Sequence, residues 1–184
     1  MEHAQEKEAK ILLLGMTGAG KSTFINRLTN HFKGGSPQNL KIAIPTKYLK
    51  VTENETTHSE KDIDDERKSK TRECKAYSFT DPKDQSNKFI FIDTPGLSDV
   101  DGAEQDKENI TKIIKSTLDA QQLSGIAIVA NGTEARFTSA MKNTLEQLAN
   151  NLPDKLLDNL LLILTKCEEH TATLNPDTFF AKPK

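Results

Sequence analysis

The feature that most constrains the fold is a glycine-rich segment near the start of the chain, GMTGAGKS at residues 15–22. It matches the pattern G-x-x-x-x-G-K-[ST] in full, in which glycines let successive backbone N–H groups face phosphates at the positive end of the next helix. The apolar run Ile11–Leu14 precedes the segment and the helical pattern of residues 22–29 follows it. This strand–loop–helix order predicts a phosphate-binding loop; a glycine-rich turn without function is the weaker alternative.

Each part of this segment has an expected role. The backbone would cradle the phosphates, Lys21 would reach the β- and γ-phosphates, and the hydroxyl of Ser22 would ligate Mg²⁺. The nucleotide-binding positions expected here are Gly15, Met16, Thr17, Gly18, Ala19, Gly20, Lys21, Ser22 and Thr23. The segment alone does not distinguish ATPases, kinases and GTPases.

A second segment, Asp93-Thr94-Pro95-Gly96-Leu97, follows the apolar pattern of Phe89–Ile92. We expect Asp93 to hold Mg²⁺ through water and the N–H of Gly96 to approach a γ-phosphate, because glycine has no Cβ in the way. Asp-x-x-Gly at this place is typical of the switch segment of GTPases. The order of the two segments therefore favours a GTPase, although an Asp-Thr-Pro-Gly turn is common by itself.

A third segment, Thr165-Lys166-Cys167-Glu168, ends the last strand pattern. GTPases carry [N/T]-K-x-D here: the lysine stem covers the guanine and the carboxylate accepts the N1 and N2 hydrogens. In this chain Glu168 stands in the Asp position, and its extra methylene displaces the acceptor by about one bond length. We expect Thr165, Lys166 and Glu168 to contact a guanine base, with a charged surface loop as the alternative.

The rest of the chain alternates strand patterns with helical patterns. Strands are expected at Lys10–Leu14, Glu73–Thr80, Lys88–Asp93, Gly125–Ala130 and Asn159–Leu164, and helices at 22–29, 104–121 and Ser139–Asn150. This alternation predicts an α/β fold with a mainly parallel central sheet flanked by helices. The turn at Asp81–Asp84 predicts a hairpin, and so one antiparallel edge strand.

Three stretches fall outside the alternation. Residues 1–8 are polar and expected to fray, and the polar, charged residues 34–70 are expected to form a long, partly mobile insertion. One domain then spans residues 9–170, and residues 171–184 form a tail. The resemblance of the three segments to those of GTPases implies a further strand and helix after residue 170, so we expect a shortened sequence or a domain completed by something else.

Composition narrows the function classes. The 184 residues carry 25 Lys and Arg against 27 Asp and Glu, so a chain that coats nucleic acid is not expected. No apolar run approaches the roughly 20 residues of a membrane span, and the first ten residues do not resemble a signal peptide. Cys74 and Cys167 are too few for a disulfide framework, which favours the cytoplasm. The charge run at 61–72 is most simply a solvated loop, with a membrane or partner contact as the alternative.

Taken in order, these segments resemble the septin-like branch of P-loop GTPases, which includes the GIMAP (avirulence-induced, immunity-associated) family. The resemblance covers about residues 9–170. SKTREC at 69–74 is similar to the switch pattern S-x-T-x-x-C of that group, and Ser98-Asp99 follows the second segment as it does there. Arg136-Phe137-Thr138 is similar to its R-[FY]-T box. The resemblance implies a G domain that binds GTP or GDP with Mg²⁺.

The resemblance also implies roles for single residues. Thr71 would be the catalytic switch residue, binding Mg²⁺ through its hydroxyl and contacting the γ-phosphate through its N–H. Thr56 and Thr57 are rival candidates for this role. The alternative for Thr71 is an ordinary residue at the start of a strand. Leu97 stands where Ras-like enzymes place a water-orienting glutamine, so hydrolysis by the isolated domain is expected to be slow or absent. Relatives often work as nucleotide-controlled dimers or polymers, which makes Arg136 a candidate for assistance across an interface.

Two other functions stay open at this point. One is a GTP-locked assembly scaffold with negligible turnover, which Leu97 favours. The other is an ATP-dependent kinase or ATPase, which the segment at 165–168 weakens.

Overall fold

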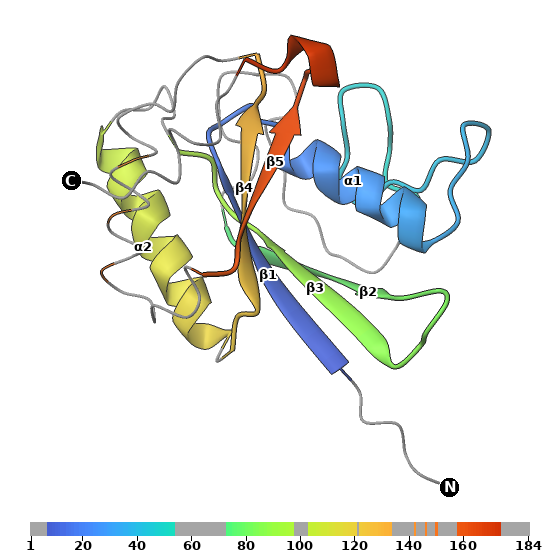
Figure 1. Ribbon diagram of the computed structural model, residues 1–184, viewed down its shortest axis with the longest axis horizontal. Helices are drawn as coiled ribbons and strands as arrows, with labels where there is room; N and C mark the ends of the chain where they lie inside the picture. Colours follow the sequence, from blue (N-terminus) through green and yellow to red (C-terminus); the bar gives the residue numbers. More distant parts are fainter. Residues whose placement is uncertain are drawn as a thin grey trace, which may run out of the picture.

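The computed structural model describes residues 7–53, 73–97, 103–120, 122–133, 142, 146, 150 and 158–173. Among the described residues, five strands form one sheet in the order β2-β3-β1-β4-β5 (Figure 1). The strands are β1 (Lys7–Gly15), β2 (Lys75–Thr80), β3 (Asn87–Asp93), β4 (Gly125–Asn131) and β5 (Leu160–Thr165). All neighbouring pairs are parallel except β2 with β3, which is antiparallel. The predicted α/β fold with one antiparallel edge strand is confirmed.

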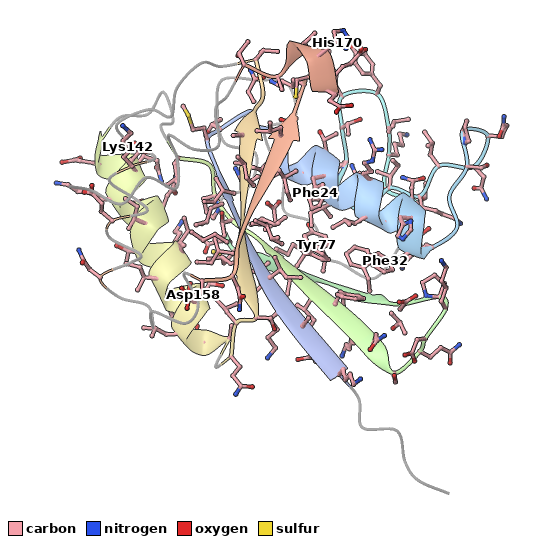
Figure 2. All side chains as sticks on the ribbon, in the orientation of Figure 1. Phe24, Phe32, Tyr77, Lys142, Asp158 and His170 are labelled. Carbon is pink, nitrogen blue, oxygen red and sulfur yellow. The ribbon has the colours of Figure 1, made fainter. Side chains whose placement is uncertain are left out.

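Helix α1 (Lys21–Phe32) covers one face of the sheet (Figure 1). Its apolar side chains recur at helical spacing, and Ile25 is fully buried in the apolar cluster on this face. Phe24, Phe32 and Tyr77 belong to the same cluster and lie between the helix and strands β2 and β3 (Figure 2). This packing holds the start of α1 at the edge of the sheet where β1 ends.

Helix α2 (Ala103–Asp119) covers the opposite face (Figure 1). Its Ile113 is fully buried in a second apolar cluster that includes Leu12 and Leu14 of β1. Leu13, between them, belongs to the α1 face because successive side chains of a strand alternate in direction. The central strand is therefore buried on both sides, as its unbroken apolar run predicts. Within the described part of the chain, no helix is long and apolar enough to cross a membrane.

Strand β1 begins at Lys7 rather than at Lys10, so the expectation that residues 1–8 fray is wrong for Lys7 and Glu8. Both residues pair in register with the start of β3. The carboxylate of Glu8 lies 3.4 Å from the ammonium groups of both Lys10 and Lys88. Ladder hydrogen bonds and opposite charges on neighbouring strands thus extend the strand into polar sequence.

The first part of the expected insertion packs on α1. We call residues 40–53 the covering segment; its Ile42, Ala43 and Ile44 are buried in the described structure. This part of the expected insertion is therefore packed against the rest of the molecule, because three successive apolar side chains give it buried contacts. Residues 54–70 and most of the expected helix Ser139–Asn150 lie outside the described residues.

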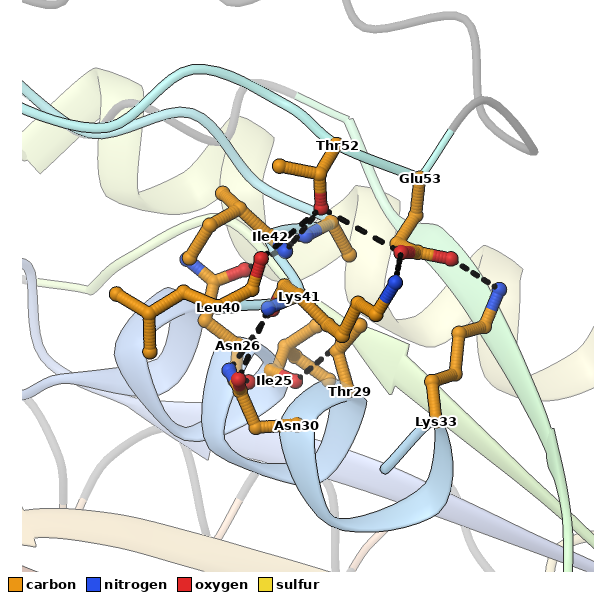
Figure 3. Close-up of polar contacts among 11 residues, drawn as sticks. Ile25, Asn26, Thr29, Asn30, Lys33, Leu40, Lys41, Ile42, Thr52 and Glu53 are labelled. Carbon is orange, nitrogen blue, oxygen red and sulfur yellow. Dashed lines mark hydrogen bonds and ion pairs between the residues drawn. The ribbon is translucent and has the colours of Figure 1, made fainter. Parts of the chain in front are cut away.

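Two asparagines of α1 hold the covering segment, and Figure 3 shows the contacts of one of them, Asn30, with Lys41. The amide of Asn26 donates to the carbonyl of Ile44 at 2.8 Å, and its oxygen accepts the N–H groups of Ala43 and Ile44 at 3.0 and 2.9 Å. Asn30 likewise donates to the carbonyl of Lys41 at 2.8 Å and accepts its N–H at 2.9 Å. These side chains supply the partners that an irregular buried backbone would otherwise lack.

An ion-pair cluster closes the far end of the covering segment (Figure 3). The carboxylate of Glu53 lies 3.1 Å from the ammonium of Lys33 and 3.6 Å from that of Lys41. The hydrogen bond from Lys33 and the charges of both lysines lower the pKa of Glu53. The contact with Lys33 thus ties the end of the covering segment to the C-terminal end of α1.

Candidate nucleotide-binding site

The glycine-rich loop connects the end of β1 to the start of α1, where the sequence predicts it. Gly18 and Gly20 have φ values of 76° and 102°, in the left-handed region that glycine adopts at little cost. Among the described residues, no side chain caps the N-terminus of α1. A helix that begins in this way presents backbone N–H groups to an anion. Ser22 and Thr23 lie in its first turn.

Lys21 points back into the loop. Its ammonium donates to the carbonyls of Gly15 at 3.0 Å and Met16 at 3.2 Å, and only 6% of the residue is exposed. A buried charge needs polar partners, and these carbonyls help to supply them. The ammonium is therefore held over the loop, within reach of a phosphate bound there.

The segment Asp93–Leu97 leaves the end of β3 beside this loop, because β1 and β3 are parallel neighbours. Asp93 is buried and its carboxylate accepts the N–H of Thr94 at 3.1 Å. The hydroxyl of Thr94 donates to the carbonyl of Leu13 at 2.6 Å, which fixes the first turn of the segment to β1. A carboxylate at this edge offers the oxygen ligands that Mg²⁺ prefers.

Gly96 and Leu97 touch the loop directly. The N–H of Leu97 donates to the carbonyl of Gly15 at 3.3 Å, and the N–H of Thr17 donates to the carbonyl of Leu97 at 2.9 Å. A Cβ placed on Gly96 would lie 2.2 Å from the hydroxyl oxygen of Thr17. Only glycine fits this close approach to Thr17. The expected approach of the Gly96 N–H to a γ-phosphate concerns a different neighbour and stays a prediction.

The side chain of Leu97 lies in the core. It is 1% exposed and packs in the apolar cluster under α2. From its place in the second segment, Leu97 is assigned to the position of a water-orienting glutamine. In the structure, the leucine side chain is part of the apolar core. Its apolar character is the one sequence signal of that place.

The loop fits a phosphate ligand. Within the described residues, the hydroxyl oxygen of Thr17 is a buried polar atom without a hydrogen-bond partner. A buried hydroxyl left in this state costs roughly 1–3 kcal/mol, and a ligand rich in oxygen acceptors would relieve that cost. Together with the buried charges of Lys21 and Asp93, this donor and ligand set suits a phosphate group and a hard cation.

The segment 165–168 lies beside the same loop, at the end of β5. The hydroxyl of Thr165 donates to the carbonyl of Ala19 at 2.5 Å and lies 3.1 Å from that of Ala130. Lys166 has a φ of 55°, and it is the non-glycine residue with positive φ in the described part of the chain. The third segment is therefore tied to the first, as expected for parts of one site.

Glu168 is already engaged within its own loop. Its carboxylate accepts the N–H of Thr171, whose hydroxyl accepts the N–H of Glu168 at 2.8 Å, so the pair caps the short helix η1 (Glu169–Thr171). His170 lies 3.5 Å from the same carboxylate, and the Glu168 side chain is 79% exposed. The sequence does not foresee this competing set of contacts.

The sequence also misses Asn109 of α2. This side chain is buried, and its amide donates to the carbonyl of Gly96 at 2.9 Å. Its position as a polar residue on the apolar face of the expected helix 104–121 is the sequence feature that could have identified it. Thr71, its rivals Thr56 and Thr57, and Arg136 lie outside the described residues.

Comparisons with known proteins agree with this arrangement. GTP-binding protein A of Dictyostelium discoideum is 27% identical over 161 residues, which cover 87% of this chain and 28% of that protein. The chain therefore spans less than a third of the length of this curated relative.

Solved structures of guanine-nucleotide proteins share the fold. Toc33 from Arabidopsis thaliana, in complex with Mg²⁺ and GMPPNP, has a TM-score of 0.54 and 18% identity over 88% of this chain and 51% of that chain. An Era variant from Aquifex aeolicus bound to GDP and AlF4⁻ has a TM-score of 0.50 and 17% identity over 89% of this chain and 42% of that chain. The ligands of these two proteins are of the kind that the sequence predicts here.

The family comparison covers most of β1, the other four described strands and the three segments as far as Lys166. Residues 10–166 match the family described as 50S ribosome-binding GTPase. The chain therefore belongs to this family of P-loop GTP-binding domains.

Proposed function

We propose that this chain binds GTP and GDP with Mg²⁺ at the edge of the sheet where the three segments meet, and that it acts as a nucleotide-controlled switch. The observation that carries the proposal is the backbone contact between the loop and the segment Asp93–Leu97, in which the N–H of Thr17 donates to Leu97. A phosphate in the loop would act on that segment without any intervening residue.

The residues of the loop and its neighbours have two roles, phosphate binding and cation binding. The loop N–H groups and Lys21 bind and orient the phosphates, while Ser22, Asp93 and Thr71 hold the cation. Mg²⁺, when bound, neutralises charge on the phosphate oxygens. The N–H of Gly96 approaches the γ-phosphate, so the segment takes one position with GTP and is released with GDP.

Thr165, Lys166 and Glu168 recognise the base in this proposal. The stem of Lys166 covers the guanine and the carboxylate of Glu168 accepts its N1 and N2 hydrogens. Because Glu168 caps η1 in this structure, guanine binding exchanges one set of hydrogen bonds for another.

Hydrolysis is slow in the monomer and depends on self-association in this proposal. The side chain of Leu97 is buried under α2 and offers no group to orient water. A nucleotide-dependent homodimer or oligomer would supply the missing group, with Arg136 as the first candidate. A GTP-locked assembly scaffold with negligible turnover is the second candidate, because the same burial of Leu97 favours it.

Specific activity measured against protein concentration, for the unmodified chain and Arg136→Ala, separates these cases. Activity that rises with concentration and falls in the variant supports assisted hydrolysis. Appreciable activity that stays flat over the range means that the monomer is competent and contradicts it. No turnover at any concentration selects the scaffold.

The finer kinship, with the septin-like branch that includes GIMAP proteins, is part of the proposal. It rests on the similar sequence at 69–74, 98–99 and 136–138, most of which lies outside the described residues. We likewise propose one G domain, which the sequence places at residues 9–170 and to which strand β1 adds Lys7 and Glu8.

Lys21→Ala tests the site directly. We expect this variant to lose tight nucleotide binding while it keeps the fold, because the ammonium meets two phosphates there. Lys83→Ala, in the exposed turn at the opposite end of β3, is the matched control. Binding of a fluorescent GTP analogue is the measurement, with thermal melting of both variants alongside. Equal affinity in Lys21→Ala and the control would overturn the assignment.

A further inference from the structure

We propose that Asn109 is a positioning residue for the segment Asp93–Leu97, and that it sets the affinity for GTP relative to GDP through the carbonyl of Gly96. The inference rests on the proposed function, since it concerns the same site. Asn109 lies on α2, on the opposite face of the sheet from the helix that follows the loop.

The amide of Asn109 is held at both ends. Its NH₂ group donates to the carbonyl of Gly96 at 2.9 Å, and its oxygen accepts the side-chain amide of Gln105 at 3.2 Å. Only 2% of Asn109 is exposed. Because the oxygen is taken by the residue one turn earlier, the donor end of the amide faces the switch segment.

Gly96 is confined from two sides. On one side Asn109 holds its carbonyl; on the other, a Cβ at Gly96 would lie 2.7 Å from the Cα of Thr17. Glycine has the greatest conformational freedom of any residue, so a hydrogen bond to its carbonyl removes more freedom here than it would elsewhere. Asn109 thereby selects one orientation of the peptide bonds that flank Gly96.

This orientation matters for one nucleotide more than for the other. The N–H of Gly96 is expected to meet the γ-phosphate, which GTP has and GDP lacks. Without Asn109 the segment would populate other orientations. The apparent affinity for GTP would then fall in proportion to the fraction of molecules whose segment still has the binding-competent orientation. GDP, which has no γ-phosphate for the N–H of Gly96 to meet, would bind as before.

The experiment compares the Kd values for a non-hydrolysable GTP analogue and for GDP, both with Mg²⁺, in four variants. Asn109→Ala removes the amide. Asn109→Asp keeps its shape but loses the NH₂ donor, and Gln105→Ala removes the contact that orients it. Thr117→Ala is the control, because Thr117 is a buried polar residue of the same helix whose hydroxyl bonds to the carbonyl of Ile113 at 2.8 Å.

We expect both Asn109 variants to bind the GTP analogue about tenfold more weakly, the effect of roughly one hydrogen bond, with GDP affinity unchanged. Gln105→Ala should show a smaller loss of the same selectivity, and Thr117→Ala none. Equal losses for the two nucleotides, or no loss for either, would overturn the inference while leaving the proposed function intact. If the unmodified chain binds neither nucleotide, the proposed function itself fails, and this inference fails with it.

Discussion

Replacing Asn26 by Ala should cost more stability than any other single truncation on α1 outside the apolar cluster. The change leaves three backbone groups of Ala43 and Ile44 without the partners that Asn26 supplies. Each buried polar group without a partner costs roughly 1–3 kcal/mol, and water that enters the space offsets part of the cost. We therefore expect the free energy of unfolding to fall by about 3 kcal/mol, which lowers Tm by roughly 6–12 °C in a chain of this size.

Asn30→Ala is the matched control. Asn30 bonds to Lys41 in the same manner, but both residues are half-buried, so water can replace the lost contacts. We expect its loss to be about 1 kcal/mol. Urea unfolding of both variants, with the slope against urea checked for constancy, gives the two values. A loss in Asn26→Ala below about 1 kcal/mol, or no larger than that of Asn30→Ala, would refute the view that Asn26 holds the covering segment.

Three further predictions follow from other parts of the molecule. Leu97→Gln should not speed hydrolysis, and it should lower the free energy of unfolding by about 2–3 kcal/mol because it buries an amide in an apolar cluster; faster turnover at unchanged stability would contradict the placement of Leu97. Burial raises the pKa of Cys74 to about 11, so its thiolate fraction at pH 8 is about one in a thousand. Alkylation of Cys74 in the folded protein, followed by peptide mass spectrometry, should therefore be slow at pH 8 and rise steeply towards pH 11; labelling at pH 8 as fast as for a small thiol would contradict it. Within the polar insertion, we expect proteases to cut residues 54–70 without nucleotide and to cut them less with a GTP analogue; equal cleavage with GTP and GDP analogues would count against Thr71 as the switch residue.

The sheet and the loop are predictable because their signals are local. The unbroken apolar run before Gly15 identifies a strand buried on both faces, and the glycine and lysine spacing of the next residues has one common structural context. Parallel pairing then brings the ends of β1, β3 and β5 to one edge of the sheet. The meeting of the three segments at that edge can therefore be predicted from the strand pattern alone.

The remaining contacts depend on residues far apart in sequence, and no periodic pattern reports them. The covering segment has irregular backbone whose partners are side chains of Asn26 and Asn30 on a different element. The link from Asn109 to Gly96 spans two elements in the same way. Glu168 shows the converse case, in which a short-range capping contact competes with the function that its place in a motif suggests.

The central claim is that the three segments form one guanine-nucleotide site. Calorimetric titration of the unmodified chain with GTP, GDP and ATP in the presence of Mg²⁺ tests it most directly. We predict that GTP and GDP bind at one site per chain and that ATP binds far more weakly, because Glu168 offers an acceptor that matches the N1 and N2 hydrogens of guanine. ATP binding as tight as that of GTP, or the absence of binding by all three nucleotides, would contradict the account.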